Sequence, residues 1–126
     1  MPEKRLYEYA VVRVVPRVER EEFLNVGVIL YCKKQDFLQC KYVLDKVRLS
    51  LFSELDLEEL EAYLQTWEKI CTGGASAGPI GLLSLPVRFR WLTATRSTVV
   101  QTSKTHPGFC EDALKTLNLL FEQLVL

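Results

Sequence analysis

The chain has 126 residues, of which 48% are hydrophobic and 25% charged, with 16 acidic and 16 basic side chains. This length suits one domain over residues 1–126 with a single hydrophobic core, and the apolar content excludes a disordered chain. The balanced charge gives no overall field that would draw the chain to nucleic acid or to an anionic membrane, so only a local patch remains for such binding.

Sequence features of a membrane or secreted protein are missing. No stretch reaches the roughly 18 apolar residues that cross a bilayer, and the N-terminal residues lack the apolar run and cleavage site of a signal peptide. We therefore expect a cytoplasmic protein with no membrane association. The four cysteines are Cys32, Cys40, Cys71 and Cys110. They form no CxxC pair and have apolar neighbours, which predicts buried free thiols and gives no reason to expect a metal or a cofactor.

Three strands are predicted in the first part of the chain. Residues 7–15 alternate between two faces, and Pro16 ends this strand because proline removes a ladder donor. Residues 25–34 form a nearly continuous apolar run, which is typical of a central strand. A turn at residues 34–36 leads to a third strand over residues 37–44, and such short connections predict an antiparallel meander.

A helical region follows the meander. Residues 45–52 suit a strand or a helix, and we favour a short helix. Asp56 and Glu59 resemble the start of a capping box. The next apolar residues, spaced by three and four, predict an amphipathic helix: Leu57, Leu60, Leu64, Trp67 and Cys71. Gly73 and Gly74 are expected to end it.

The last part of the chain predicts further strands and helices. Residues 72–79 are predicted to form a loop, and residues 79–85 a short helix with proline in its first turn. Alternation predicts strands over residues 87–93 and 97–103, and residues 111–126 read as a closing amphipathic helix. Because strands and helices are segregated, we expect an α+β fold. It has an antiparallel sheet of about five strands, three in the N-terminal meander and two later, with helices packed on it.

Polar side chains are concentrated in two strand-like runs, residues 13–32 and 96–108. A purely structural sheet does not require them there, so their density suggests a binding surface. Arg13 lies on the aromatic face of the first strand, where its planar guanidinium suits a carboxylate or a phosphate. The alternative is an ion pair with a glutamate of the following loop, or stacking on Tyr7 or Tyr9.

A second candidate surface is a basic patch of Arg88, Arg90, Arg96 and Lys104. The first two residues leave the same face of the predicted strand, opposite Phe89 and Trp91, which we expect in the core. This patch can bind phosphate groups. Two arginines on the solvent face of an edge strand are an equally simple explanation, because they protect the edge from aggregation.

Acid–base chemistry has few candidates in this chain. They are Glu19, Glu22 and His106, the only histidine. No complete catalytic or phosphate-binding motif is present. Glutamates in a charged loop and a histidine in a polar turn are more simply structural or exposed. Asn25 is read as a turn or cap residue, and Gly27 as the mark of a bulge or a close backbone approach.

The two polar runs also carry a family resemblance. The phrases RVEREEFLNVGV and RSTVVQTS, with AGPIGLL between them and an amphipathic helix at the end, resemble the bacterial family called domain of unknown function 3037. The resemblance extends from Tyr7 to the C-terminus. The positions that match are Arg13, Arg17, Glu19, Arg20, Asn25, Gly27, Arg96, Ser97, Thr98, Gln101, Ser103 and His106. Pro107 stands where the resemblance implies a residue other than proline, which speaks against a catalytic geometry around His106.

The resemblance implies a partner or regulator of a HipA-like kinase, a toxin kinase of bacterial toxin–antitoxin systems. We therefore expect a small cytoplasmic binding or regulatory module that binds a protein partner or an anionic group on it. The expected binding residues are Arg13, Arg17, Glu19, Arg20, Asn25, Arg96, Ser97, Thr98, Gln101, Ser103 and His106. One alternative is an enzyme for a phosphorylated or nucleotide substrate, with a loop glutamate and His106 as acid and base. Another is an RNA-binding module that uses the basic patch, although nucleic acid is the less favoured partner.

Overall fold

A computed structural model describes residues 3–20, 22–50, 55–96 and 98–126. The sheet consists of β1 (Arg5–Val14), β2 (Leu24–Cys32), β3 (Phe37–Tyr42), β4 (Val100–Thr102) and β5 (His106–Cys110). The helices are α1 (Lys46–Leu49), α2 (Leu57–Thr72), α3 (Leu85–Thr93) and α4 (Ala113–Leu124). Three short 3-10 helices are η1 (Val18–Arg20), η2 (Ala75–Ala77) and η3 (Pro79–Leu82). The predicted α+β class with a five-stranded antiparallel sheet is confirmed.

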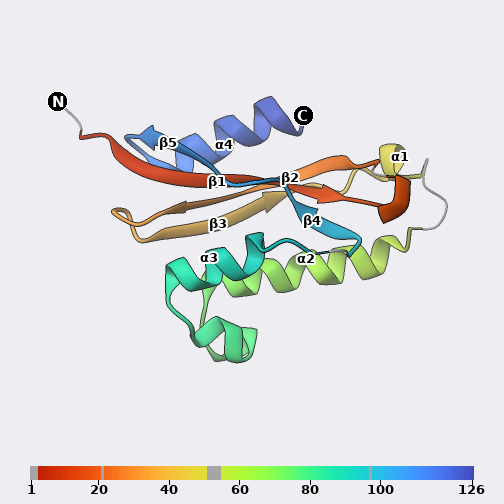
Figure 1. Cartoon of the computed structure of the whole chain (residues 1–126), viewed down its shortest axis with the longest axis horizontal. Helices are drawn as coiled ribbons and strands as arrows, with labels where there is room; N and C mark the ends of the chain where they lie inside the picture. Colours follow the sequence, from red (N-terminus) through yellow and green to blue (C-terminus); the bar gives the residue numbers. More distant parts are fainter. Residues whose placement is uncertain (1–2, 21, 51–54, 97) are drawn as a thin grey trace.

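β1 is the strand around which the sheet is organised. The first three strands form the predicted meander, and the order across the sheet is β3-β2-β1-β4. β5 pairs with the same edge of β1 as β4 does: β4 lies opposite residues 12–14, and β5 lies opposite residues 5–9. The two short strands therefore follow one another along β1 (Figure 1).

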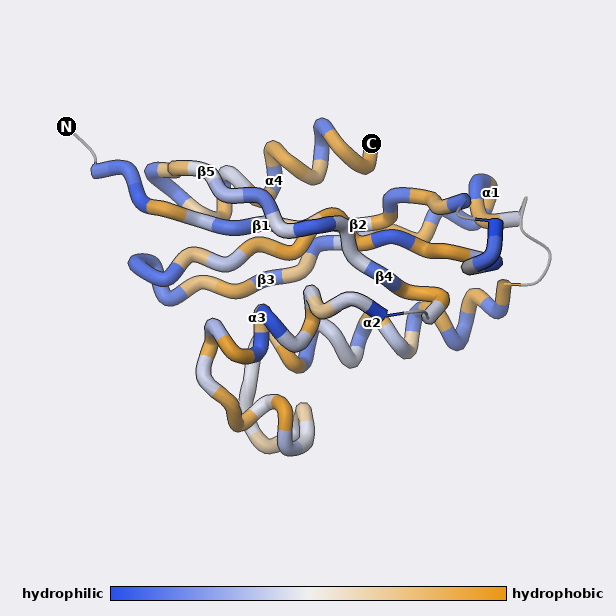
Figure 2. Tube along the Cα trace, in the orientation of Figure 1, coloured by the Kyte–Doolittle hydropathy of each residue, from blue (hydrophilic) through white to orange (hydrophobic). Residues whose placement is uncertain are grey.

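Helices cover both faces of the sheet, with α4 on one face and α2 and α3 on the other (Figure 1). Alternation along β1 supplies both layers, because Ala10, Val12 and Val14 pack in the cluster with α2 and α3, whereas Tyr7 and Tyr9 pack against the cluster with α4. β2 is buried on both faces from Val26 onward, as its continuous apolar run predicts. Figure 2 shows this hydrophobic stretch in the middle of the sheet.

The amphipathic helices begin and end where their sequences indicate. The Asp56 side chain accepts hydrogen bonds from the N–H groups of Glu58 and Glu59, and α2 ends at Gly73, which has φ +83°. α4 begins at Asp112, whose carboxylate accepts from the Lys115 N–H. The ambiguous segment after β3 contains the short helix α1, as favoured from the sequence.

The predicted strand over residues 87–93 is wrong, because these residues belong to helix α3. Leu85, Phe89 and Leu92 follow a spacing of four and three and face the core, so the helical period fits the apolar residues better than alternation does. Phe89 is buried as expected, whereas Trp91 is 40% exposed and lies outside the core.

The prediction of a polar turn around His106 is also wrong, because β5 begins there. The Tyr7 ring lies directly over Gly108 of β5: a Cβ at Gly108 would be 2.5 Å from Cζ of Tyr7. A side chain at position 108 would clash with this ring, so a glycine is required there. Because glycine is common in turns, its presence favoured a turn in the sequence-based prediction. β4 is shorter than its predicted range of 97–103, since only Val100–Thr102 pair as a strand.

All four cysteines are buried and free, as predicted. Burial raises the pKa of Cys71 to about 12, so this thiol stays protonated at neutral pH. Within the described residues, no helix is long and apolar enough to span a bilayer.

Candidate functional site

The two polar runs of the sequence lie side by side, because β1 pairs with β4. Arg13 of β1 lies opposite Gln101 of β4 on one side and opposite Asn25 of β2 on the other. The neighbouring Val12 and Val14 point into the core beneath α2, so Arg13 points to the α4 side of the sheet. A β-bulge between Val12 and Arg13 sets this register. These three polar residues therefore form a row across three strands.

Arg13 is held in place but has no ionic partner among the described residues. Its guanidinium carbon lies 4.1 Å from the centroid of the Phe23 ring, and Phe23 is 49% exposed. Stacking is thus present, although on Phe23 and not on Tyr7 or Tyr9. The Nε atom of Arg13 is buried without a hydrogen-bond partner, and among the described residues its guanidinium forms no ion pair.

Asn25 has an unsatisfied atom of the opposite kind. Its Nδ2 donates to the Leu124 carbonyl at 3.2 Å, which ties β2 to the end of α4 and fixes the orientation of the amide. Its Oδ1 atom is buried and has no hydrogen-bond partner in the part of the chain that the structure describes. A buried unpaired polar atom costs about 1–3 kcal/mol, so such atoms are rare in folded proteins. We therefore take this row, with a free donor on Arg13 and a free acceptor on Asn25 in adjacent strands, as the candidate binding position.

His106 extends the row along β1. It lies opposite Tyr9, and the two ring centroids are 5.3 Å apart. His106 is exposed. It lies on the same face of the sheet as α4, but α4 packs mainly against β2 and β3 and leaves this part of the face open. We call the surface formed by Tyr9, Arg13, Asn25, Gln101 and His106 the Arg13 face.

Ser103, a predicted binding residue, has a structural role between β4 and β5. Its N–H donates to the Val11 carbonyl at 2.8 Å, and its hydroxyl accepts from the Val11 N–H at 2.9 Å. The same hydroxyl donates to the Lys104 carbonyl at 2.9 Å. The buried Ser103 hydroxyl thus accepts the hydrogen bond from Val11 that a backbone carbonyl of a neighbouring strand would otherwise accept, at the point where the chain leaves β4.

Replacement of Ser103 by alanine is expected to destabilise the protein by about 2 kcal/mol, because it leaves the buried Val11 N–H without an acceptor. Urea unfolding followed by circular dichroism measures this loss. Thr105→Ala, at an exposed position two residues later, is the control and should change stability by less than about 0.5 kcal/mol. Equal stability of the two variants would contradict the structural role of Ser103.

Arg96 and Thr98, two other predicted binding residues, lie outside the Arg13 face. Arg96 stacks over the rings of Trp67 and Trp91, 5.5 and 4.9 Å from their centroids, and donates to the Trp91 carbonyl. These contacts place it on the α2 side of the sheet. Thr98 donates to the Val100 carbonyl within the turn before β4. Ser97 lies outside the described residues.

The loop between β1 and β2 carries the remaining predicted residues. Arg20 and Glu22 form an exposed ion pair at 2.7 Å, whereas the alternative of a loop ion pair was proposed for Arg13. Arg17 and Glu19 are exposed in or beside η1. An exposed pair of this kind contributes little to stability.

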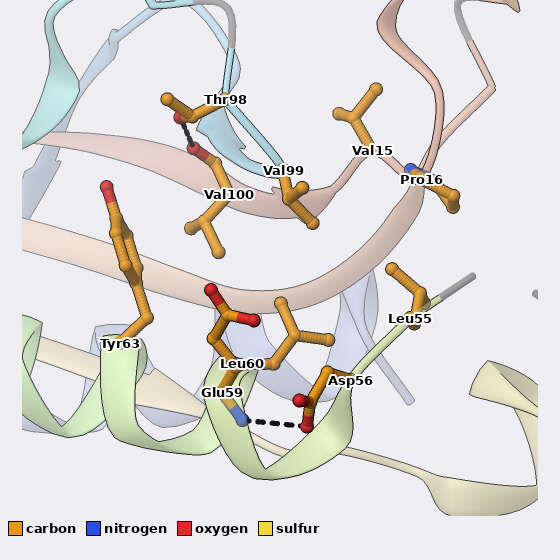
Figure 3. Close-up of a pocket in the computed structure, with 10 residues that line it drawn as sticks. All are labelled: Val15, Pro16, Leu55, Asp56, Glu59, Leu60, Tyr63, Thr98, Val99 and Val100. Carbon is orange, nitrogen blue, oxygen red and sulfur yellow. Dashed lines mark hydrogen bonds between the residues drawn. The ribbon is translucent and has the colours of Figure 1, made fainter.

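Sequence reasoning did not find a pocket of about 450 Å³ between the start of α2 and β4 (Figure 3). Its wall is mainly apolar, and it is lined by Val15, Pro16, Leu55, Asp56, Glu59, Leu60, Tyr63, Thr98, Val99 and Val100. Thr98 is the only predicted site residue in it. The Asp56 carboxylate is already engaged as the N-cap of α2.

The predicted basic patch does not form. Arg88 is buried, with its Nη1 donating to the Ile70 and Cys71 carbonyls at 2.7 and 2.8 Å, and its Nε donating to the Leu83 carbonyl at 3.0 Å. Arg88 therefore caps the C-terminal end of α2. Arg90 is exposed on α3, and no face of this helix presents both arginines to a phosphate backbone.

The predicted acid–base pair is widely separated. His106 lies opposite Tyr9, whereas Glu22 precedes Leu24, which lies opposite Val14. Five residues of β1 separate these positions, about 17 Å at the rise of a strand. An acid and a base must reach the same substrate, so this spacing does not support joint catalysis by the two residues.

The fold and the Arg13 face define a small α+β protein with a partly open five-stranded sheet. The sequence model of the family described as protein of unknown function (DUF3037) matches residues 9–125. The chain belongs to this family, which confirms the resemblance seen in its sequence. No curated protein and no solved structure matches the chain.

Proposed function

We propose that this protein is a binding module that holds a protein partner on the Arg13 face. The observation that carries the proposal is the pair of unsatisfied atoms, Nε of Arg13 and Oδ1 of Asn25, in adjacent strands. Proteins rarely leave such atoms buried and unpaired unless something else satisfies them.

The chemistry of the row indicates which group binds. A guanidinium that forms no ion pair with the described residues favours a carboxylate, which can accept two parallel hydrogen bonds from it. The free Oδ1 of Asn25 needs a donor nearby, such as a peptide N–H. Because Nε of Arg13 and Oδ1 of Asn25 are closed to solvent in the free protein, the neighbouring side chains must shift when the partner binds. An acidic residue of the partner then supplies both groups, its side chain to Arg13 and its backbone N–H to Asn25. Phe23, Tyr9 and His106 offer ring surface around this anchor, and such residues are common at interfaces.

A HipA-like kinase remains the predicted partner on the basis of the family resemblance. Affinity purification of the tagged protein from its native host, with mass spectrometry, identifies the partner without assuming it. Direct co-purification with a HipA-like kinase tests the specific prediction, and failure at low salt with both proteins folded would contradict it.

Arg13→Ala is expected to weaken binding to the identified partner about 30-fold, as removal of an interface anchor does. Arg13→Lys should recover only part of the affinity, because an ammonium group cannot make the bidentate contact. Isothermal titration calorimetry measures both dissociation constants. The control is Arg20→Ala, which removes the same charge from the exposed loop and should change affinity less than about threefold.

Melting temperatures of the variants separate loss of binding from loss of folding. The proposal fails if Arg13→Ala remains folded and binds the partner as tightly as the unchanged protein. It also fails if Arg20→Ala weakens binding as much as Arg13→Ala does.

A further inference from the structure

The other edge of the sheet is open along β3. β3 is the terminal strand in the order β3-β2-β1-β4, and within the described residues no strand pairs with its outer side. β1, β4 and β5, which carry every residue of the Arg13 face except Asn25, lie beyond β2 from this edge (Figure 1). An exposed edge strand is a template for pairing with another chain unless it is protected.

The register shows which backbone groups point outward. The Val43 N–H donates to the Val26 carbonyl, so residues at every second position from Val43 face β2 with their backbone groups. The N–H and C=O groups of Leu38, Cys40 and Tyr42 therefore point away from the sheet. Among the described residues, none of these groups has a backbone partner.

The open edge lies in a groove with walls on both sides. A pocket of about 420 Å³ extends along residues 39–42, between Glu68 of α2 and the α4 residues Leu114 and Asn118. A second pocket of about 500 Å³ continues along residues 36–39, next to α3. Leu114 is 47% exposed and supplies apolar surface on the α4 side. The groove is therefore long enough for one extended segment of about the length of β3.

The pocket along residues 39–42 is lined by one acid, Glu68, and one base, Lys41, whose Nζ is already engaged with Oδ1 of Asn118 at 2.9 Å. Burial, and after it the nearby Glu68 carboxylate, raise the pKa of Tyr42 above its ordinary value. Within the described residues, the Glu68 carboxylate forms no ion pair. A carboxylate at a sheet edge that forms no ion pair with the described residues favours a basic side chain on the segment that binds there.

We infer that the β3 edge binds an extended segment of a partner polypeptide, which adds a sixth strand and places a Lys or Arg against Glu68. The backbone groups of Leu38, Cys40 and Tyr42 provide the pairing, and the side-chain pockets provide selectivity, as in other cases of strand addition. A second copy of this chain fits less well, because pairing of two β3 edges brings two Glu68 carboxylates to the same seam. This inference is independent of the Arg13 face.

Selection of random heptapeptides displayed on phage against the whole protein provides the probe. We expect the selected peptides to be rich in β-branched residues and to share one Lys or Arg. A synthetic peptide of that consensus should bind Glu68→Gln about fivefold more weakly than the unchanged protein, the upper end for a solvent-facing ion pair. The control is Glu122→Gln, an exposed acid on α4 that lines neither β3 pocket, and it should leave the affinity unchanged.

Amide hydrogen exchange by NMR tests the pairing itself. Bound peptide should slow exchange at Leu38, Cys40 and Tyr42 and leave Gln39 and Lys41 nearly unchanged, because those two amides already face β2. The inference is overturned if no peptide is selected, if Glu68→Gln binds equally well, or if protection does not alternate. A concentration-dependent dimer with the same alternating protection would also overturn it, since a second copy would then occupy the edge.

Discussion

Arg88→Met is expected to lower the free energy of unfolding by about 3 kcal/mol. Methionine keeps most of the side-chain length but removes three hydrogen bonds, to the carbonyls of Leu83, Ile70 and Cys71. Each buried carbonyl left without a donor costs about 1–3 kcal/mol, and relief from burying a charge offsets part of the sum. The midpoint of urea unfolding measures the net loss.

The three hydrogen bonds of Arg88 depend on the shape of its guanidinium group. The carbonyls at the end of α2 have no partner within the helix, and the planar guanidinium reaches two of them with one nitrogen. Gly73 makes room for this group, because a Cβ there would lie 2.6 Å from Nη1 of Arg88. Arg88→Lys keeps the charge but lacks the planar guanidinium that makes these hydrogen bonds. We therefore expect its loss of stability to be smaller than that of Arg88→Met.

Arg90→Met is the matched control, two residues later on the same helix and exposed. It should change the free energy of unfolding by less than about 0.5 kcal/mol. The two substitutions would have similar effects if residues 87–93 formed a strand with both arginines on one solvent face. Equal losses for Arg88→Met and Arg90→Met would therefore contradict the capping role.

Gly27→Ala is expected to destabilise the protein by about 3 kcal/mol and to lower the melting temperature by roughly 10 °C. An added Cβ would lie 2.6 Å from the Lys41 carbonyl oxygen and 2.8 Å from Cβ of Tyr42. The carbonyl belongs to the backbone of the adjacent strand, so the contact is relieved only by shifting β2 against β3. Differential scanning calorimetry measures the change.

Gln39→Ala is the control for this second prediction. It changes an exposed side chain on β3 without adding an atom to the β2–β3 contact, and it should alter stability by less than about 0.5 kcal/mol. A Gly27→Ala variant as stable as Gln39→Ala would show that the two strands separate easily.

Local patterns predicted most of the regular structure correctly. The spacing of apolar residues in α2 and α4 and the alternation in β1 reflect contacts that each element must make with a core, whatever its neighbours are. Gly27 was predicted to mark a bulge or a close backbone approach, and both are present. The register of β1 and β2 shifts next to Gly27, and its Cα lies close to the backbone of β3. These features depend on a few consecutive residues.

The errors arose where two local patterns compete. Val87, Phe89 and Trp91 alternate like a strand, but Leu85, Phe89 and Leu92 also have helical spacing, and packing against the core selects the helix. Pro86 near the start of α3 was the signal for a helix that the alternation obscured. In β5, turn-forming residues concealed a strand that exists because β1 offers it an edge.

The sequence by itself determined the fold class, the family and the two polar runs, since these follow from composition, periodicity and local phrases. Only the tertiary structure decided which of those polar residues lie next to one another on the same face of the sheet. Pairing of β1 with β4 brings Arg13 to Gln101, while the same fold sends Arg96 to the opposite face and Ser103 into the backbone ladder. The physical reason is that strand pairing and burial are set by closure of the whole core, and one-residue alternation along a strand then assigns each side chain to a face.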